Sequence, residues 1–151
     1  MRLRPENRKR RGTSLVETSL VIVVFLTVIL GTLDLCLGVF RNNTLSQAAR
    51  QLARQAVVHG SLSSSPWGPT AYGPVAANDS GAITTALQPY LVGMDPADVT
   101  VTVTWPDGGN APDQGCRVQV ALSTPYRPTM TFLFGNPTYT LTATSTMPIA
   151  H

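Results

Sequence analysis

Residues 12–40 read GTSLVETSLVIVVFLTVILGTLDLCLGVF, and this stretch decides the fold. No charged residue lies between Thr18 and Leu33, and the stretch is long enough for the roughly 20 residues that cross a bilayer as a helix. A core helix of a soluble domain would show a polar face, and this stretch shows almost none. The sequence therefore predicts a transmembrane helix over residues 13–40.

A basic leader, residues 1–12, lies directly before the apolar stretch. It holds six of the 11 Lys and Arg residues against a single acid, Glu6, in a chain whose formal net charge is +3. The positive-inside rule then keeps the leader in the cytoplasm and places the C-terminal part outside, as a single-pass protein of the cell membrane. The same cluster could contact nucleic acid, but topology already explains it, and we expect no nucleic-acid partner.

Two other export signals fit the N-terminus less well. A cleavable secretory signal has an apolar core of about 7–15 residues followed by a small-x-small site. The core here is longer, and no good site of that kind follows near Asp34 to Arg41. A lipoprotein signal would use Cys36, but Asp34 and Leu35 violate the small residues expected before the cysteine. The two cysteines, Cys36 and Cys116, do not form a disulfide framework.

Two acidic residues interrupt the predicted membrane helix, Glu17 near its start and Asp34 near its end. The carboxylate of Glu17 near hydrocarbon costs several kcal/mol unless it is neutralised or paired, so a residue in its place usually has a function. The alternative for Glu17 is that it only stabilises the helix start, where the dipole favours an anion and Thr13 or Ser14 supplies the N-cap. The residues alone leave both interpretations open.

The succession of a basic leader, Gly12, four residues, Glu17 and an apolar helix resembles the prepilin signal of type IV pilus-like systems. Further residues are similar to the TadE-like family of minor pseudopilins of the tight-adherence (Tad/Flp) pilus. They are RRGTSLVETSLV at residues 10–21, Asp34, RNNTL at residues 41–45 and AAR at residues 48–50. The similarity is good over about the first 60 residues.

The resemblance implies cleavage by prepilin peptidase between Gly12 and Thr13. Glu17 would become the fifth residue of the mature chain, and Thr13 and Glu17 would set the register between subunits during assembly. The implied partners are the membrane, the peptidase, other pilin and pseudopilin subunits and the inner-membrane assembly platform. The implied function is assembly or initiation of the pilus. The alternative is an uncleaved single-span membrane protein whose extracytoplasmic β-domain binds a partner.

Beyond the membrane, the sequence predicts a continued helix and then a loop. Residues 41–59 continue the helix as an amphipathic segment, because apolar residues recur at steps of three and four, namely Leu45, Ala48 or Ala49, Leu52 and Ala56. Residues 60–97 are rich in Ser, Pro and Gly and predict a surface loop with a short helix near residues 81–91, capped by Asn78, Asp79 or Ser80.

The period changes to two in residues 98–151, which predicts an antiparallel sheet. Apolar residues alternate with polar ones in three runs, namely Val99 to Trp105, Cys116 to Leu122 and Tyr139 to Ser145. One face of such a sheet needs a cover, and the outer half of the long helix can supply it. The expected fold is α+β and pilin-like, a long N-terminal helix packed on a small antiparallel sheet. The apolar residues 129–134 lie either on the membrane or against the helix, and we favour partial burial.

The sequence shows no motif for catalysis. His59 and His151 are isolated from other metal-ligating residues, and neither a nucleophile elbow nor a phosphate-binding loop occurs. The acidic residues beyond the helix lie mostly in turns, where Asp is common. We therefore expect a protein that is not an enzyme and that has no cofactor, no metal and no small-molecule substrate.

Overall fold

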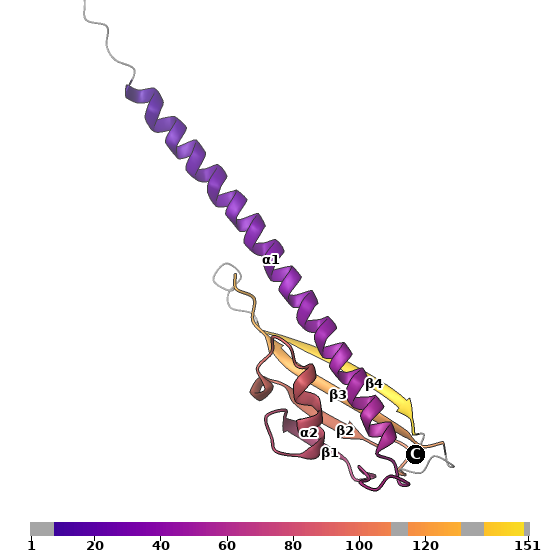
Figure 1. Ribbon diagram of the computed structural model, residues 1–151. Helices are drawn as coiled ribbons and strands as arrows, with labels where there is room; N and C mark the ends of the chain where they lie inside the picture. The colour runs from indigo at the N-terminus through magenta and orange to yellow at the C-terminus, as the bar shows by residue number, and fades with distance from the viewer. Residues whose placement is uncertain (1–7, 110–114, 131–137, 150–151) are drawn as a thin grey trace, which may run out of the picture.

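The structure is a computed structural model that describes residues 8–109, 115–130 and 138–149. Its elements are α1 (Arg8–Val58), β1 (Tyr72–Ala76), α2 (Ala82–Leu87), the 3-10 turns η1 (Gln88–Tyr90) and η2 (Pro96–Asp98), β2 (Thr100–Thr104), β3 (Arg117–Tyr126) and β4 (Tyr139–Pro148). The four strands form one antiparallel sheet in the order β1-β2-β3-β4. The expected α+β fold, with a long N-terminal helix on a small antiparallel sheet, is confirmed (Figure 1).

Helix α1 has 51 residues and no proline, and it runs without a break from Arg8 to Val58. At a rise of 1.5 Å per residue it is about 75 Å long. It begins five residues before the expected start at Thr13, because the run of Arg and Lys there consists of good helix formers. Its N-terminal half projects away from the rest of the protein, whereas its C-terminal half crosses the sheet over β3 and β4 (Figure 1).

The C-terminal half of α1 buries the face that its periodicity predicts. Its fully or almost fully buried residues are Leu45, Ala48, Ala49, Leu52, Ala53 and Ala56, while Arg50 and Arg54 remain exposed. Four of these six side chains are alanines, so the helix axis can approach the sheet closely. Ile83 and Leu87 of α2 belong to the same apolar core. Both helices therefore cover the one apolar face of the sheet.

Strands β2 and β3 show the predicted alternation. Val101 and Val103 are buried while the threonines beside them are only partly buried, and the register pairs Val101 with Leu122 and Val103 with Val120. In β4 the most buried residue is Ala143, which pairs with Leu122. Valine and threonine share a β-branched shape that suits a strand, and the valines lie on the inner face because their side chains are fully apolar.

The sheet contains one strand that the sequence did not predict. Residues 72–76, expected to belong to a surface loop, form β1 at the edge beside β2. Pro74 cannot donate a backbone hydrogen bond, which an edge strand tolerates and a central strand does not. Gly73 has φ +92°, and a Cβ there would overlap the Val101 carbonyl oxygen of β2. The Gly-Pro pair that indicates a loop is here the irregular part of an edge strand.

The predicted short helix is present but shorter than expected. Helix α2 ends at Leu87 and passes into the 3-10 turn η1, which contains Pro89. Its N-cap is Gly81 and not one of the polar residues expected there. The Thr84 hydroxyl instead donates to the backbone oxygens of Asp79 and Gly81, at 2.9 and 2.8 Å.

An ion pair closes the sheet at the end opposite the projecting helix. Arg117 donates to Asp107 from its backbone N–H, its Nε and its Nη2, at 2.9, 3.1 and 3.0 Å. The hydrogen bonds from Arg117 lower the pKa of the Asp107 carboxyl, and in return Asp107 raises the pKa of the guanidinium. Both side chains are substantially exposed, so the pair orients the chain after β2 more than it stabilises the fold.

Strand phase can be tested with charges on the two faces of β2. Val101→Asp would bury an unpaired carboxylate and should destabilise the sheet by roughly 3–5 kcal/mol, whereas Thr102→Asp points to the other face and should cost far less. Limited proteolysis of the full chain in detergent would measure the difference. Equal protease sensitivity of the two variants would contradict the assigned faces.

Candidate functional site

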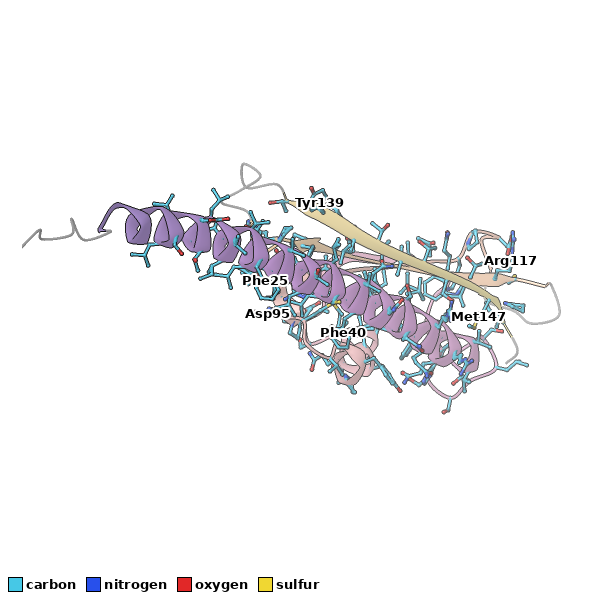
Figure 2. All side chains as sticks on the ribbon, turned by 90° about the horizontal axis from the view of Figure 1, so that it is seen from above. Phe25, Phe40, Asp95, Arg117, Tyr139 and Met147 are labelled. Carbon is cyan, nitrogen blue, oxygen red and sulfur yellow. The ribbon has the colours of Figure 1, made fainter. Side chains whose placement is uncertain are left out.

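The N-terminal half of α1 is an apolar rod with almost no cover. Its large apolar side chains from Leu15 to Phe40 are exposed, and Phe25 illustrates this on the projecting part of the helix (Figure 2). Within the described residues, one helix, Ser14–Val58, is long and apolar enough to cross a membrane. An uncovered apolar surface of this size requires an apolar environment. The structure therefore indicates a single-pass membrane protein.

The structure places the predicted site residues along α1 and does not bring them all together. Gly12 and Thr13 lie in the first turns of the helix, and Glu17 follows one turn after Thr13 with its side chain exposed. Asp34 lies about 25 Å further along the helix axis, because 17 residues separate it from Glu17. Glu17 and Asp34 therefore belong to different environments, one at the start of the apolar rod and one near the sheet.

Five hydroxyl groups along α1 form hydrogen bonds within the helix itself. Each donates to the carbonyl oxygen one turn earlier, at 2.6–3.0 Å; these residues are Thr18, Ser19, Thr27, Thr32 and Thr44. Such back-bonding removes the cost of an unpaired hydroxyl in hydrocarbon. The only charged side chain from Thr18 to Phe40 is Asp34, which cannot use this solution because a carboxylate only accepts.

Asp34 is buried and is held by the opposite end of the chain. Its Oδ1 accepts the backbone N–H of Thr129 at 2.9 Å, and its Oδ2 accepts the backbone N–H of Met130 at 2.8 Å. The Tyr126 hydroxyl donates to the Asp34 backbone oxygen at 2.7 Å. One residue of α1 thus receives three hydrogen bonds from the end of β3 and the residues that follow it.

Tyr126 completes this contact through its ring. The Arg41 guanidinium carbon lies 5.4 Å from the centre of the ring, within the range of a cation–π interaction. A Cβ added to Gly38 would lie 3.4 Å from the ring, so glycine leaves the tyrosine room against the helix. Tyr126 therefore contacts α1 at three successive turns.

We call residues 126–130 and Tyr139 the hairpin arm, because they extend the β3–β4 pair along α1 toward the exposed rod. Tyr139 lies at the end of the sheet that faces this rod, and Arg117 and Met147 lie at the other end (Figure 2). Between the arm and α1 runs a groove of about 660 Å³. Its lining residues are Thr27, Val28, Gly31, Thr32, Asp34, Leu35, Gly38, Val39, Tyr126, Pro128, Met130 and Tyr139.

The hairpin arm shows where the first residues of the apolar run 129–134 lie, which the sequence alone left open. Of the apolar residues 129–134, Thr129 and Met130 lie against the helix, and Met130 is 4% exposed. Residues 131–134 lie outside the described part of the chain. The signals for this contact were an acidic residue in an apolar helix and an apolar run in a predicted hairpin, but neither signal says that the two meet.

Residues 12–54 match the family model described as TadE-like protein. The resemblance expected from the sequence is thus confirmed for this part of the chain. No curated protein and no solved structure matches the chain. The matched segment covers most of α1 and includes Gly12, Thr13, Glu17 and Asp34.

Removing the Asp34 carboxylate should release the hairpin arm. In Asp34→Ala the amides of Thr129 and Met130 lose their acceptors, and their hydrogen exchange should accelerate about tenfold or more. Thr32→Ala is the matched control, since it removes a polar side chain from the same turn that bonds only within the helix. Hydrogen-exchange mass spectrometry in detergent would read the peptide that contains residues 126–130. Unchanged exchange in Asp34→Ala would show that the carboxylate does not hold the arm.

Proposed function

We propose that this protein is a minor pseudopilin of a Tad/Flp pilus. Residues 1–12 would lie in the cytoplasm, α1 would cross the membrane, and the sheet would lie outside. Prepilin peptidase would cut after Gly12, and the mature chain would join other pilin subunits on the inner-membrane platform to start or extend the pilus. The protein would act as a subunit and would carry out no catalysis.

The exposed apolar half of α1 is the observation that carries this proposal. The sheet and α2 cover the helix only from about Asp34 onward, so the helix surface from Leu15 to Leu33 is left for lipid or for other helices. A subunit that leaves the membrane to join a fibre must exchange lipid for protein along this same surface. The TadE-like match over residues 12–54 supports the choice of pilus subunits as those other helices.

The polar ends of this surface support the proposed topology. The basic leader precedes the exposed rod, and Arg41 is the first basic residue after it. The imbalance of charge favours the leader on the cytoplasmic side. Helix α1 continues without a break past Arg41 into the half that packs on the sheet. In this arrangement α1 would hold the sheet close to the extracytoplasmic face of the membrane that it crosses.

Processing at Gly12 is the first test. Gly12→Val should slow removal of the leader at least about tenfold, while insertion should persist because the apolar run and the basic flank that drive it are unchanged. Mass spectrometry of membrane extracts from cells that contain the peptidase would measure the fraction of chains that begin at Thr13. Ser19→Val, further along the rod, is the control and should be processed normally.

The same measurement separates the proposal from an uncleaved membrane protein. A wild-type chain that keeps its leader in those cells would refute cleavage and would favour a single-span protein whose outer sheet binds a partner. Processing of Gly12→Val at the wild-type rate would also remove the support that the prepilin-like signal gives.

Glu17 provides the second test. After cleavage, Thr13 would carry a free ammonium group one helical turn from Glu17, and a carboxylate that enters a bundle of low dielectric constant needs such a cation. Glu17→Ala and Glu17→Gln should insert normally or better, but pilus numbers and co-purification with other subunits should fall about tenfold or more. Glu17→Asp keeps the charge and should retain most of the assembly. Normal pili in Glu17→Ala and Glu17→Gln would show that Glu17 only favours the helix start.

A further inference from the structure

With α1 across a bilayer and Arg41 at its interface, the groove beside the hairpin arm lies at the depth of the hydrocarbon. It extends along α1 from Thr27 to Val39, and Arg41 is the first charged residue beyond it. Along the helix axis, Thr27 lies about 21 Å from Arg41, in a hydrocarbon layer about 30 Å thick. The arm follows α1 into this region, since Met130 packs over Gly31. The groove is therefore a part of the membrane-spanning surface and not a pocket in water.

Irregular backbone at this depth needs internal partners. Hydrocarbon offers no hydrogen bonds, so an unpaired N–H there costs several kcal/mol. The amides of Thr129 and Met130 lie outside the strands, and both donate to the Asp34 carboxylate. Asp34 therefore supplies what hydrocarbon cannot supply to the arm. This role accounts for a buried acid in a segment that otherwise excludes charge.

The groove itself is lined mainly by apolar side chains, and most of its polar groups already have partners within the protein. The hydroxyls of Thr27 and Thr32 are used by the helix, the Tyr126 hydroxyl by the Asp34 backbone, and both Asp34 oxygens by the arm. The remaining lining is aliphatic, aromatic or thioether, apart from the Tyr139 hydroxyl. The complementary occupant is a flexible chain without polar groups. We propose that the groove binds an acyl chain from the leaflet that adjoins the sheet, and that the hairpin arm is a second membrane-inserted element beside α1.

Continuity with the lipid-facing surface favours this occupant over a second copy of the chain. The groove opens onto exposed side chains of the same helix, such as Val28, Leu35 and Val39, which contact lipid wherever α1 spans a membrane. The groove has free space beside Gly31, because a Cβ there would meet only the Met130 sulfur, at 4.0 Å. The proposal goes beyond the pseudopilin function and requires only that α1 crosses a bilayer.

A fluorescence experiment in nanodiscs tests the proposal. Tyr139→Trp places an indole at the lining position that is 55% exposed, and the nanodiscs hold one full-length chain each, which excludes a second copy. The native tryptophans lie at the far end of the sheet, where Trp67 stacks on His59 and Trp105 lies beside Gly68. Their emission is measured in the parent chain and subtracted.

Phosphatidylcholine brominated in its acyl chains should quench roughly half of the added emission in Tyr139→Trp, because indole and bromine share the hydrocarbon layer. Leu62→Trp, 77% exposed beyond the end of α1, is the control and should keep its emission. Equal quenching of the two variants, or none in either, would overturn the proposal.

A second variant separates the groove from mere contact with the membrane. Gly31→Leu would fill the groove and should reduce the quenching of the Tyr139→Trp indole by about half, while an added Leu remains compatible with a helix. Leu33→Phe enlarges a lipid-facing side chain that does not line the groove, and it should leave the quenching unchanged. Undiminished quenching in Gly31→Leu would contradict an acyl chain in the groove. None of these outcomes depends on cleavage at Gly12 or on pilus assembly.

Discussion

A four-stranded sheet with one apolar face cannot stand alone in water, and the cover that α1 supplies is the interaction on which the rest of this structure depends. The inner face presents Val101, Val103, Val120 and Leu122, and the helix meets it with a surface composed mainly of alanine. The same helix continues into the apolar rod without a linker. Packing of the sheet on one half of α1 therefore determines where the sheet stands relative to the other half.

A second constraint acts where α1 leaves the sheet. In that region, polar groups must find partners within the protein, and the chain meets this demand in two ways. Threonine and serine hydroxyls return to the helix itself, whereas Asp34 pairs with the backbone of the hairpin arm. The first solution is local, because the acceptor is a carbonyl oxygen one turn earlier in the same helix. The second joins two segments about 95 residues apart and so links the helix and the sheet in one structural unit.

The parts of the fold that follow from local patterns could be predicted from the sequence. The uncharged run after Thr18, the spacing of Leu45 and Leu52, and the alternation around Val101 each contain their own signal, because burial of one face repeats with the period of the element. Strand β1 could not be predicted in this way. Its Gly73-Pro74 pair is typical of a loop, and only the partner strand β2 makes it an edge strand.

The candidate site could likewise be predicted only in part. Asp34 was recognisable as an unusual acid in an apolar helix, but its partners were not, since Tyr126, Thr129 and Met130 lie near the other end of the chain and their neighbours show no pattern that points to α1. The contact also uses backbone N–H groups, which every residue except proline has. A sequence cannot mark such a partner by residue type. Its position follows only from the register of β3 against β4 and from the place where the sheet meets the helix.

Because α1 is unbroken, a rotation of the sheet moves the opposite end of the helix. With the sheet clamped on residues near Leu45, the helix extends about 55 Å to Arg8, and it contains no proline at which it could hinge. A rotation of the sheet by roughly 10° would carry the far end of the helix through about 10 Å. Torque applied on one side of the bilayer would therefore arrive on the other as tilt, and a pull along the axis would pass through the ladder of helical hydrogen bonds.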